Sequence, residues 1–583
     1  MTVDLLLESI NERVVGALVH FEASQGAGAV TAVGQIVSIE LHNRWHQDSV
    51  FRNLIKRTGE IPPITGLQDT RVARLAVGAT FQAEDSGGYV PITLGMVPST
   101  GTAIERVDQP QLDRLLSSFS DELFYLGRAY ANDVFYPKWF KHFGSGPRGS
   151  GEAYHLGVFG KTGSGKSGLA KMLLAAYARH PELGILVIDP QGEFSHELAG
   201  QRIGRQGLPL DGIIAGYGRP IQRYTIADLQ LEGWDLFEDF LVQMHFCEKV
   251  LGIPMQSVDN GRLAAEYITD ALKKKDAFKL AELGSDDALR FVLNAARDRA
   301  GRIYASQPRA ERLQDRIDEI LAGEFAHVLA ETWKPICALF AAGGRRRKIY
   351  GIVRDLVESD AEGGPRPLVV IDISERSNDS KFWSEELERR ILARLLGVLI
   401  DNASKGLAKN EGANTLVVLD EAHRHAPSGP LDGDSQAAQL RSVLRRAVRE
   451  TRKYGVGWFF ISQTLGGIDN EILHQLRSLF FGFGLALGDE YRKLREFTGG
   501  DEPAMDLYRS FRDPASAPRD DLREFPFMAV GPVSPLSYSG RPLFFSAFID
   551  PQEFCRVNGL EVRESAPQPP NGSPTLTLLP DLS

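Results

Sequence analysis

Residues 160–167 have the types and spacing of a phosphate-binding loop. The run Gly160-Lys-Thr-Gly-Ser-Gly-Lys-Ser167 matches the P-loop pattern G-x-x-x-x-G-K-[ST], between strand-like Tyr154–Phe159 and helical Gly168–Arg179. Glycines let successive backbone N–H groups curl around phosphates, and a helix N-terminus adds partial positive charge. A glycine turn joining a strand to a helix is the structural alternative. The predicted nucleotide-binding residues are Gly160, Lys161, Thr162, Gly163, Ser164, Gly165, Lys166, Ser167 and Gly168.

Two of these side chains have specific expected tasks. Lys166 would neutralise the β- and γ-phosphates, which also makes it a predicted catalytic residue. The Ser167 hydroxyl would coordinate Mg²⁺. No Asn-Lys-x-Asp run specifies guanine in this chain, so ATP is the expected nucleotide.

A pair of acidic residues follows another apolar run. Leu416–Leu419 would deliver Asp420 to the edge of a sheet, where it can bind Mg²⁺. Glu421, directly after it, would take a proton from the attacking water or orient it. The alternative is a strand that ends in a solvated acidic turn.

Further polar residues follow the other predicted strands. Asp189 and Glu193, in Asp189-Pro-Gln-Gly-Glu193, could supply an auxiliary carboxylate at the nucleotide, although a Pro-Gly turn uses Asp for purely structural reasons. Gln463 could sense the γ-phosphate or position water, or be a polar strand terminus. His423 and His425 lack the Cys or further His that a zinc site would need.

A helical segment, Gln436–Lys453, carries a stripe of arginines at helical spacing. A solvated charged face is the ordinary interpretation of such a stripe. Here acidic residues are scarce in the segment, and an arginine finger that reaches the γ-phosphate of a neighbouring subunit is the functional interpretation. Arg452 is favoured because it lies nearest the following strand. The stripe consists of Arg441, Arg445, Arg449 and Arg452.

The elements that must position these residues indicate an α/β fold. β-branched or aromatic runs alternate with helical patterns, which is typical of a largely parallel sheet covered on both faces. Ligands of such sheets bind beyond the carboxyl ends of the strands. The predicted strands are His155–Gly160, Gly184–Asp189, Leu368–Asp372, Thr415–Asp420, Gly457–Gln463 and Leu479–Leu485.

The remaining segments have a different character. Short β-rich runs near the N-terminus suggest a small barrel or sandwich without a catalytic constellation. The full expected division is an N-terminal β-barrel at 1–105, a connector at 106–150, a nucleotide-binding core at 151–230 and 346–520, a helical insertion at 231–345, a C-terminal segment at 521–564 and a disordered tail at 565–583.

Composition limits the function classes. The chain has 583 residues and 24% charged side chains, which excludes a disordered chain, a collagen and a coiled-coil rod. Its net charge is 66 − 76 = −10, so nucleic-acid binding would need a local basic patch. Three distant cysteines form no disulfide framework, and no uncharged apolar run approaches the ~20 residues of a membrane span. We therefore expect a cytoplasmic protein without membrane association.

Together the motifs resemble the HerA-like hexameric ATPases of the HerA/FtsK group. The resemblance covers about residues 10–550 and rests on the P-loop, Asp189-Pro-Gln-Gly-Glu193-Phe, Leu416–His423, Arg449-Glu-Thr-Arg452-Lys453-Tyr-Gly and Ile461-Ser-Gln463. It implies a RecA-like P-loop ATPase core with the inter-subunit finger at Arg452, although Thr451 stands where a glycine is common.

The same resemblance implies partners that composition did not suggest. It implies a homohexamer that moves on double-stranded DNA with ATP and Mg²⁺, and a C-terminal segment that braces the neighbouring subunit. It also implies an N-terminal module that docks a NurA-like nuclease or a Sir2-type or other effector, in DNA end processing and repair or in antiviral defence. Arg202, Arg205 and Arg345-Arg-Arg-Lys348 are candidate phosphate contacts in the pore, or simply solvated loops.

Two alternatives remain open. One is a ring ATPase of the conjugation or secretion type that moves protein or nucleoprotein. The other is a nucleotide-gated ring scaffold that assembles and activates an effector enzyme.

Overall fold

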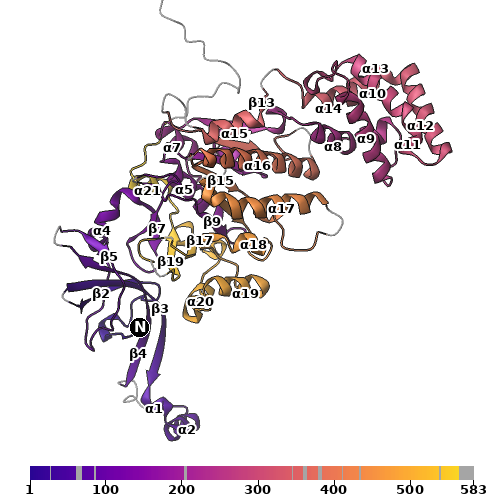
Figure 1. Cartoon of the computed structure of the whole chain (residues 1–583). Helices are drawn as coiled ribbons and strands as arrows, with labels where there is room; N and C mark the ends of the chain where they lie inside the picture. Colours follow the sequence, from indigo (N-terminus) through magenta and orange to yellow (C-terminus); the bar gives the residue numbers. More distant parts are fainter. Residues whose placement is uncertain are drawn as a thin grey trace, which may run out of the picture.

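The computed structural model describes residues 1–563 except 27, 61–67, 85–86, 147, 202–206, 344–345, 359–363, 379–383, 410, 432–434, 533 and 538–539. The described residues form an N-terminal β-module, a central α/β core and a helical lobe that projects from the core (Figure 1). The predicted tail at 565–583 lies outside the described residues. No helix in the described part of the chain combines the length and apolar character of a transmembrane segment.

The N-terminal module is an antiparallel sheet with strand order β1-β4-β3-β2-β6 and β5 paired to β4. Its elements are β1 (Thr2–Asp4), β2 (Leu18–Gln25), β3 (Gly28–Asn43), α1 (Arg44–Gln47), α2 (Ser49–Thr58), β4 (Asp69–Ala83), β5 (Tyr89–Pro91) and β6 (Glu105–Arg106). The predicted small barrel is not confirmed, because the sheet is open between β1 and β6 in the described residues. These end strands have only three and two residues, too few for a closing ladder. The long strands β3 and β4 instead extend as a ribbon with α1 and α2 at its tip (Figure 1).

The core is built on a mixed sheet of eleven strands, which confirms the predicted α/β class. The strand order is β11-β14-β10-β15-β16-β9-β17-β18-β19-β7-β8, parallel from β11 to β17 and antiparallel from there to β8. The strands are β7 (Leu123–Ala129), β8 (Phe135–Trp139), β9 (His155–Phe159), β10 (Gly184–Asp189), β11 (Ile221–Thr225), β14 (Leu368–Asp372), β15 (Thr415–Leu419), β16 (Val456–Ser462), β17 (Leu476–Phe481), β18 (Pro526–Val530) and β19 (Leu543–Ala547).

Helices cover both faces of this sheet, and alternate strand residues enter two different hydrophobic cores. In β15, Val417 and Leu419 pack toward α15, α16 and α17, whereas Leu416 and Val418 pack toward α5, α7 and α21. Each fully buried aliphatic side chain contributes about 1.5–3 kcal/mol, so a strand buried on both faces is apolar throughout. The helices are α5 (Lys166–Ala178), α7 (Leu210–Gly216), α15 (Ile349–Val357), α16 (Glu385–Ala408), α17 (Ser435–Glu450) and α21 (Pro551–Val557). Shorter helices near the strand ends are α6 (Glu193–Glu197), α18 (Asn470–Leu473), α19 (Gly488–Phe497) and α20 (Glu502–Arg509).

The projecting lobe occupies the range in which the sequence predicted a helical insertion. The parallel pair β12 (Leu229–Gln230) and β13 (Arg347–Lys348) holds its two ends side by side. Its helices are α8 (Trp234–Gln243), α9 (Val258–Lys273), α10 (Asp286–Asp298), α11 (Ala300–Ile303), α12 (Gln307–Glu319), α13 (Phe325–Val328) and α14 (Lys334–Ala338). Buried Trp333 packs edge-on against Phe237 and donates its indole N–H to Leu283 O at 2.7 Å, which joins the lobe's helices.

Two segments contribute to the sheet in a way that the sequence did not suggest. The stretch 106–150, interpreted as a connector, contains α4 (Gln109–Leu115) and the edge strands β7 and β8. The C-terminal segment places β18 against β17 and β19 against β7 of its own chain. Five of the seven residues of β7 are buried, so the strand lacks the polar-apolar alternation of a half-exposed strand. The sequence therefore contains no clear signal for a strand here.

Candidate active site

The predicted phosphate loop joins the carboxyl end of β9 to the N-terminus of α5. Gly163 and Gly165 have φ values of +83° and +85°, which glycine adopts without steric cost. The first turn of α5 carries no acidic residue, so its partial positive charge is not offset by a side chain there. Lys166, the first helical residue, is buried, and Ser164 Oγ is buried without a hydrogen-bond partner in the described part of the chain. This geometry is that of an anion-binding loop.

The strand order brings the other predicted residues to the same edge. Strand β16 lies between β9 and β15, with Ser462 in register with Phe159 and Phe460 in register with Leu419. Because neighbouring parallel strands end at one edge, Gln463 follows its strand beside the P-loop, and Asp420 follows on the next strand along.

A chain of hydrogen bonds connects these residues. The Thr162 hydroxyl donates to Gln463 Oε1 at 3.0 Å. Gln463 Nε2 in turn donates to Glu421 Oε1 at 2.6 Å. The side-chain amide of Gln191 donates to the same oxygen at 2.8 Å. The phosphate loop, the residue after β16 and the predicted water-activating carboxylate are therefore linked.

Glu421 is held in an unusual backbone conformation. Its φ of +44° is left-handed, which costs a non-glycine residue about 1–2 kcal/mol. Its backbone N–H donates to Asp420 Oδ1 at 2.9 Å, and its side chain is 5% exposed. Its Oε2 atom accepts no hydrogen bond from the described residues, although His423 Nδ1 lies 3.3 Å away. Two amides thus hold one carboxylate oxygen, and no described residue donates to the other.

Asp420 is buried among other carboxylates. Burial, and then the charge of Glu421, raise the pKa of Asp420 to about 7, with smaller contributions from Asp189 and Glu193. A divalent cation would offset the negative charge of these clustered carboxylates. Asp420 and half-buried Ser167 offer the oxygen ligands that Mg²⁺ prefers. The residues therefore fit Mg²⁺ brought with a nucleotide. No cluster of three or more His, Cys, Asp or Glu suited to an independent metal site occurs among the described residues.

Asp189 and Glu193 have structural partners. Asp189 accepts backbone N–H bonds from Gly192, Glu193 and Ser195 at 2.8–3.2 Å, which organises the start of α6. Burial raises the pKa of Asp189 despite these bonds. Glu193 and Glu197 bind the Lys171 ammonium at 2.5 and 2.6 Å, and their charges raise the pKa of Lys171 against the opposing effect of its burial. Both predicted auxiliary carboxylates thus hold the turn beside the site.

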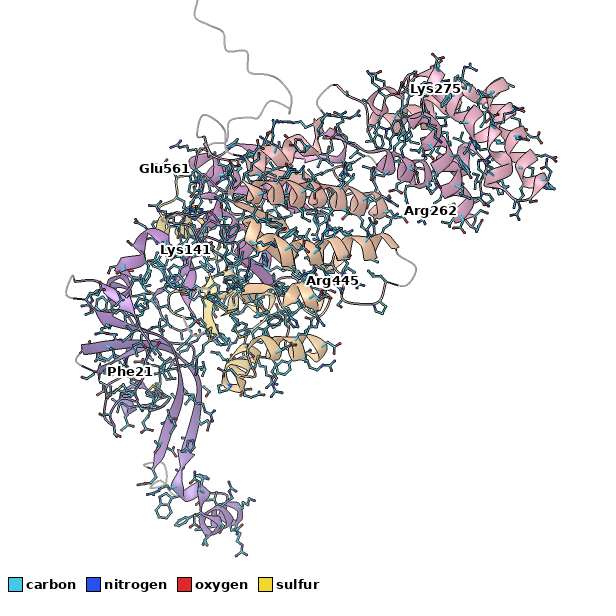
Figure 2. All side chains as sticks on the ribbon, viewed as in Figure 1. Phe21, Lys141, Arg262, Lys275, Arg445 and Glu561 are labelled. Atoms are coloured by element: carbon cyan, nitrogen blue, oxygen red, sulfur yellow. The ribbon has the colours of Figure 1, made fainter. Side chains whose placement is uncertain are left out.

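The arginines of α17 are less free than their sequence context suggested. Arg441 donates to the carbonyls of Pro427 and Gly429. Arg445, labelled in Figure 2, pairs with Asp469 at the start of α18 and with Glu471. Arg449 lies 3.8 Å from Glu450. Asp469, directly before α18, and Glu471, within α18, thus supply Arg445 with acidic partners from outside the segment.

Arg452 lies at the opposite edge of the sheet from the phosphate loop. It belongs to the 3₁₀ turn Thr451–Tyr454 that leads into β16, and its carbonyl accepts from the Ala153 N–H just before β9. Its guanidinium is 3.5 Å from Glu152 and about half exposed. The seven residues of β16 separate it from Gln463 by about 23 Å. Arg452 therefore cannot contact the phosphate loop of its own chain.

The contacts of Thr451 explain how the chain accommodates this residue where the HerA-like family commonly has a glycine. Its hydroxyl is fully buried, donates to Ala447 O at 2.7 Å and accepts the Trp458 indole N–H at 3.0 Å. The β-branched residue is thus accommodated by a partner on β16.

Gln191 and His423 are site residues whose place the sequence did not reveal. Gln191 is a neutral residue inside a turn motif, and only the sheet edge brings it to Glu421. The sequence indicates His423 only as a possible metal ligand, but in the structure its ring lies 3.2 Å from Ser462 Oγ. Burial lowers the pKa of His423, which favours the neutral imidazole.

The candidate pore arginines have partners where they are described. Arg346 donates to Ala227 O and Ala338 O, Arg347 pairs with Asp355, and Lys348 pairs with Glu232. Arg202, Arg205 and Arg345 lie outside the described residues. The paired members hold the base of the helical lobe.

Three solved structures illustrate what this chain is similar to. VirB4 of Thermoanaerobacter pseudethanolicus has 15% identity and a TM-score of 0.38, over 74% of this chain and 97% of that chain. The genome packaging NTPase B204 from Sulfolobus turreted icosahedral virus 2, with AMPPCP, has 10% identity and a TM-score of 0.28, over 68% and 98%. The bacterial conjugative coupling protein TrwB has 11% identity and a TM-score of 0.35, over 68% and 85%. No curated protein matches the chain.

The family model of the helicase HerA central domain matches residues 153–378. These residues are similar to the HerA central domain, which confirms the resemblance drawn from the sequence motifs. The matched range contains the phosphate loop, Asp189 and the helical lobe, and it ends before Asp420. Glu421, Gln463 and Arg452 lie outside the matched range, so the match does not bear on the tasks expected of them.

Proposed function

We propose that this chain is the subunit of a homohexameric ring that hydrolyses MgATP and moves double-stranded DNA. The observation that carries the proposal is the hydrogen-bond chain from Thr162 through Gln463 to Glu421. It connects the loop that would hold the γ-phosphate with a carboxylate that can accept a proton. A merely structural glycine turn has no need of that connection.

In the proposed reaction, Lys166 and the loop N–H groups hold the triphosphate, and Ser167 and Asp420 hold its Mg²⁺. Glu421 orients a water and takes its proton as the oxygen bonds to the γ-phosphorus. The bond to the β–γ bridging oxygen breaks, giving ADP and phosphate. Gln463 lies where it can contact the γ-phosphate through the Thr162 side of the loop.

The ring is supported by the position of Arg452. A half-exposed guanidinium at the edge of the sheet opposite its own phosphate loop can complete only the site of another copy. A finger in trans would stabilise the transition-state charge and couple hydrolysis to movement between subunits.

The proposal also includes a DNA track and an effector protein as partners of the ring. The similarity to the HerA central domain favours double-stranded DNA as the track, with a NurA-like nuclease or a Sir2-type or other effector in end processing or phage defence. The N-terminal module offers a docking element, because none of the residues of α2 is buried, and Val50 and Leu54 are 72% and 50% exposed.

The test is ATP turnover by the full chain, with and without linear duplex DNA, together with native mass measurement. We expect a hexamer whose turnover rises with duplex and is lost in Lys166→Ala. Turnover indifferent to duplex would favour a conjugation- or secretion-type ring that moves protein. A Lys166→Ala ring that assembles and fully activates its partner would favour the nucleotide-gated scaffold.

A further inference from the structure

A cavity of about 410 Å³ separates the phosphate loop from a C-terminal segment of the same chain. Gly165, Lys166 and Ser167 line one side. Ala515, Arg523 and Phe525, from the residues that precede β18, line the other. The volume lies in the range of small-molecule sites.

Phe525 is fixed as one wall of this cavity. A Cβ atom at Gly165 would lie 2.6 Å from Phe525 Cδ1, so the ring packs directly on the loop backbone. The Phe525 carbonyl accepts from the Ala547 N–H at 2.9 Å, which ties the residue to β19. The half-buried ring packs on the core that contains α5 and leaves the rest of its surface toward the cavity.

Arg523 brings a guanidinium group to the same wall. One of its terminal nitrogens pairs with Asp520 at 3.0 Å. Its Nε atom is buried and has no hydrogen-bond partner among the described residues, so a ligand in the cavity meets the terminal nitrogens instead.

We propose that Phe525 and Arg523 form the nucleoside subsite of the same chain's ATP site, which rests on the proposed function. Phe525 packs against the base or the ribose, and a terminal nitrogen of the Arg523 guanidinium donates to an acceptor of the nucleoside. The ligand class is nucleoside 5′-triphosphates and diphosphates, because an aromatic face accepts every base. The resemblance assigned this segment to bracing a neighbour. Here it serves its own phosphate loop.

If Phe525 and Arg523 bind only the nucleoside, their mutation should weaken binding of a nucleotide but not of the phosphate chain alone. Binding of MgATP and of magnesium tripolyphosphate is titrated on the full chain and its variants. Phe525→Ala should weaken MgATP about tenfold and leave tripolyphosphate within about twofold, because stacking on the nucleoside alone is lost. Arg523→Gln should weaken MgATP about fivefold with the same selectivity. Arg519→Gln is the matched control, since Arg519 is an exposed arginine of the same segment paired with Asp521, and it should change neither ligand.

Other outcomes overturn the assignment. Equal weakening of both ligands by Phe525→Ala would mean that the ring only supports the phosphate loop. Unchanged MgATP affinity in both Phe525→Ala and Arg523→Gln would remove the subsite. Failure of the wild type to bind either ligand would reject the proposed function itself. Arg523→Gln, a change at a half-exposed side chain, keeps the test valid if Phe525→Ala fails to fold.

Discussion

Gln463 donates a 2.6 Å hydrogen bond to Glu421 while its carbonyl oxygen accepts from Thr162 of the phosphate loop at 3.0 Å. The amide is therefore bound on one side by the loop that would hold the γ-phosphate and on the other by the carboxylate that would activate water. Any shift of the loop on nucleotide binding changes the first bond, and through the rigid amide it changes the second.

The carboxylate itself is the first point to test. Glu421→Gln keeps the size of the side chain but removes the proton acceptor, so MgATP should bind while turnover falls at least ~10²-fold. Single-turnover hydrolysis and nucleotide affinity are measured together. Glu411→Gln is the control, because Glu411 is exposed and precedes β15 at its other end. Near wild-type turnover by Glu421→Gln would reject the assignment.

The two amides on Glu421 Oε1 should differ in their effects. Gln463 contacts both the loop and the carboxylate, whereas Gln191 contacts the carboxylate at 2.8 Å. Gln463→Ala should lower kcat about tenfold or more with little change in ATP affinity. Gln191→Ala should lower kcat less. The reverse order of the two kcat losses would show that Gln463 is only a polar strand end.

The finger assignment makes a prediction about mixtures. Arg452→Ala should abolish hydrolysis, and mixing it with Lys166→Ala subunits should restore part of it at interfaces that combine an intact loop with an intact arginine. Arg302→Ala, a charge change on an exposed residue of the helical lobe, is the control and should leave turnover unchanged. The absence of recovery over all mixing ratios would count against action in trans.

Much of this site was predictable because it lies at the ends of apolar strands. The run Leu368–Asp372 is a strand with the same bounds in the structure, and Asp420 and Gln463 follow their strands at the expected edge. The place of Arg452 also follows from chain order, because a turn before a parallel strand lies at its amino end. Local patterns sufficed for these residues.

Other features depend on contacts between distant segments. Gln191 reaches Glu421 across 230 positions, and β7 pairs with β19 from the far end of the chain. The barrel was expected from strand spacing alone, but closure depends on whether β1 and β6 pair, and both are too short. Neither kind of contact leaves a local signal.

DNA binding should depend steeply on salt. In a chain of net charge −10, contact with duplex must come from local basic side chains that displace counterions from phosphates. We expect affinity to fall about 10³-fold or more between 50 and 200 mM salt if six or more phosphates are contacted. Fluorescence anisotropy with a labelled duplex, at several salt concentrations, measures the slope. A flat dependence would argue against phosphate tracking.

A buried lysine on β8 should make the stability of the fold depend on pH. Lys138 on β8 is fully buried, its Nζ has no hydrogen-bond partner among the described residues, and it faces the rings of Phe140 and Phe480 at 5.3 and 5.9 Å. Burial lowers the pKa of Lys138 from 10.5 to about 7. Between these two values the unfolded chain binds the extra proton, so stability should rise with pH across this window and be lowest below about pH 7.

Lys138→Met removes this titration and fills the same space. The variant should be more stable than the wild type by a few kcal/mol near pH 6.5, and the difference should shrink as the pH approaches 10.5. Chemical unfolding at several pH values measures it. Lys141→Met is the matched control, because Lys141, labelled in Figure 2, is partly exposed and pairs with Glu122 at 3.0 Å, so it should bring no such gain. Stability curves for Lys138→Met and the wild type that run parallel between pH 6.5 and 10.5 would mean that the buried amine does not titrate differently in the folded chain.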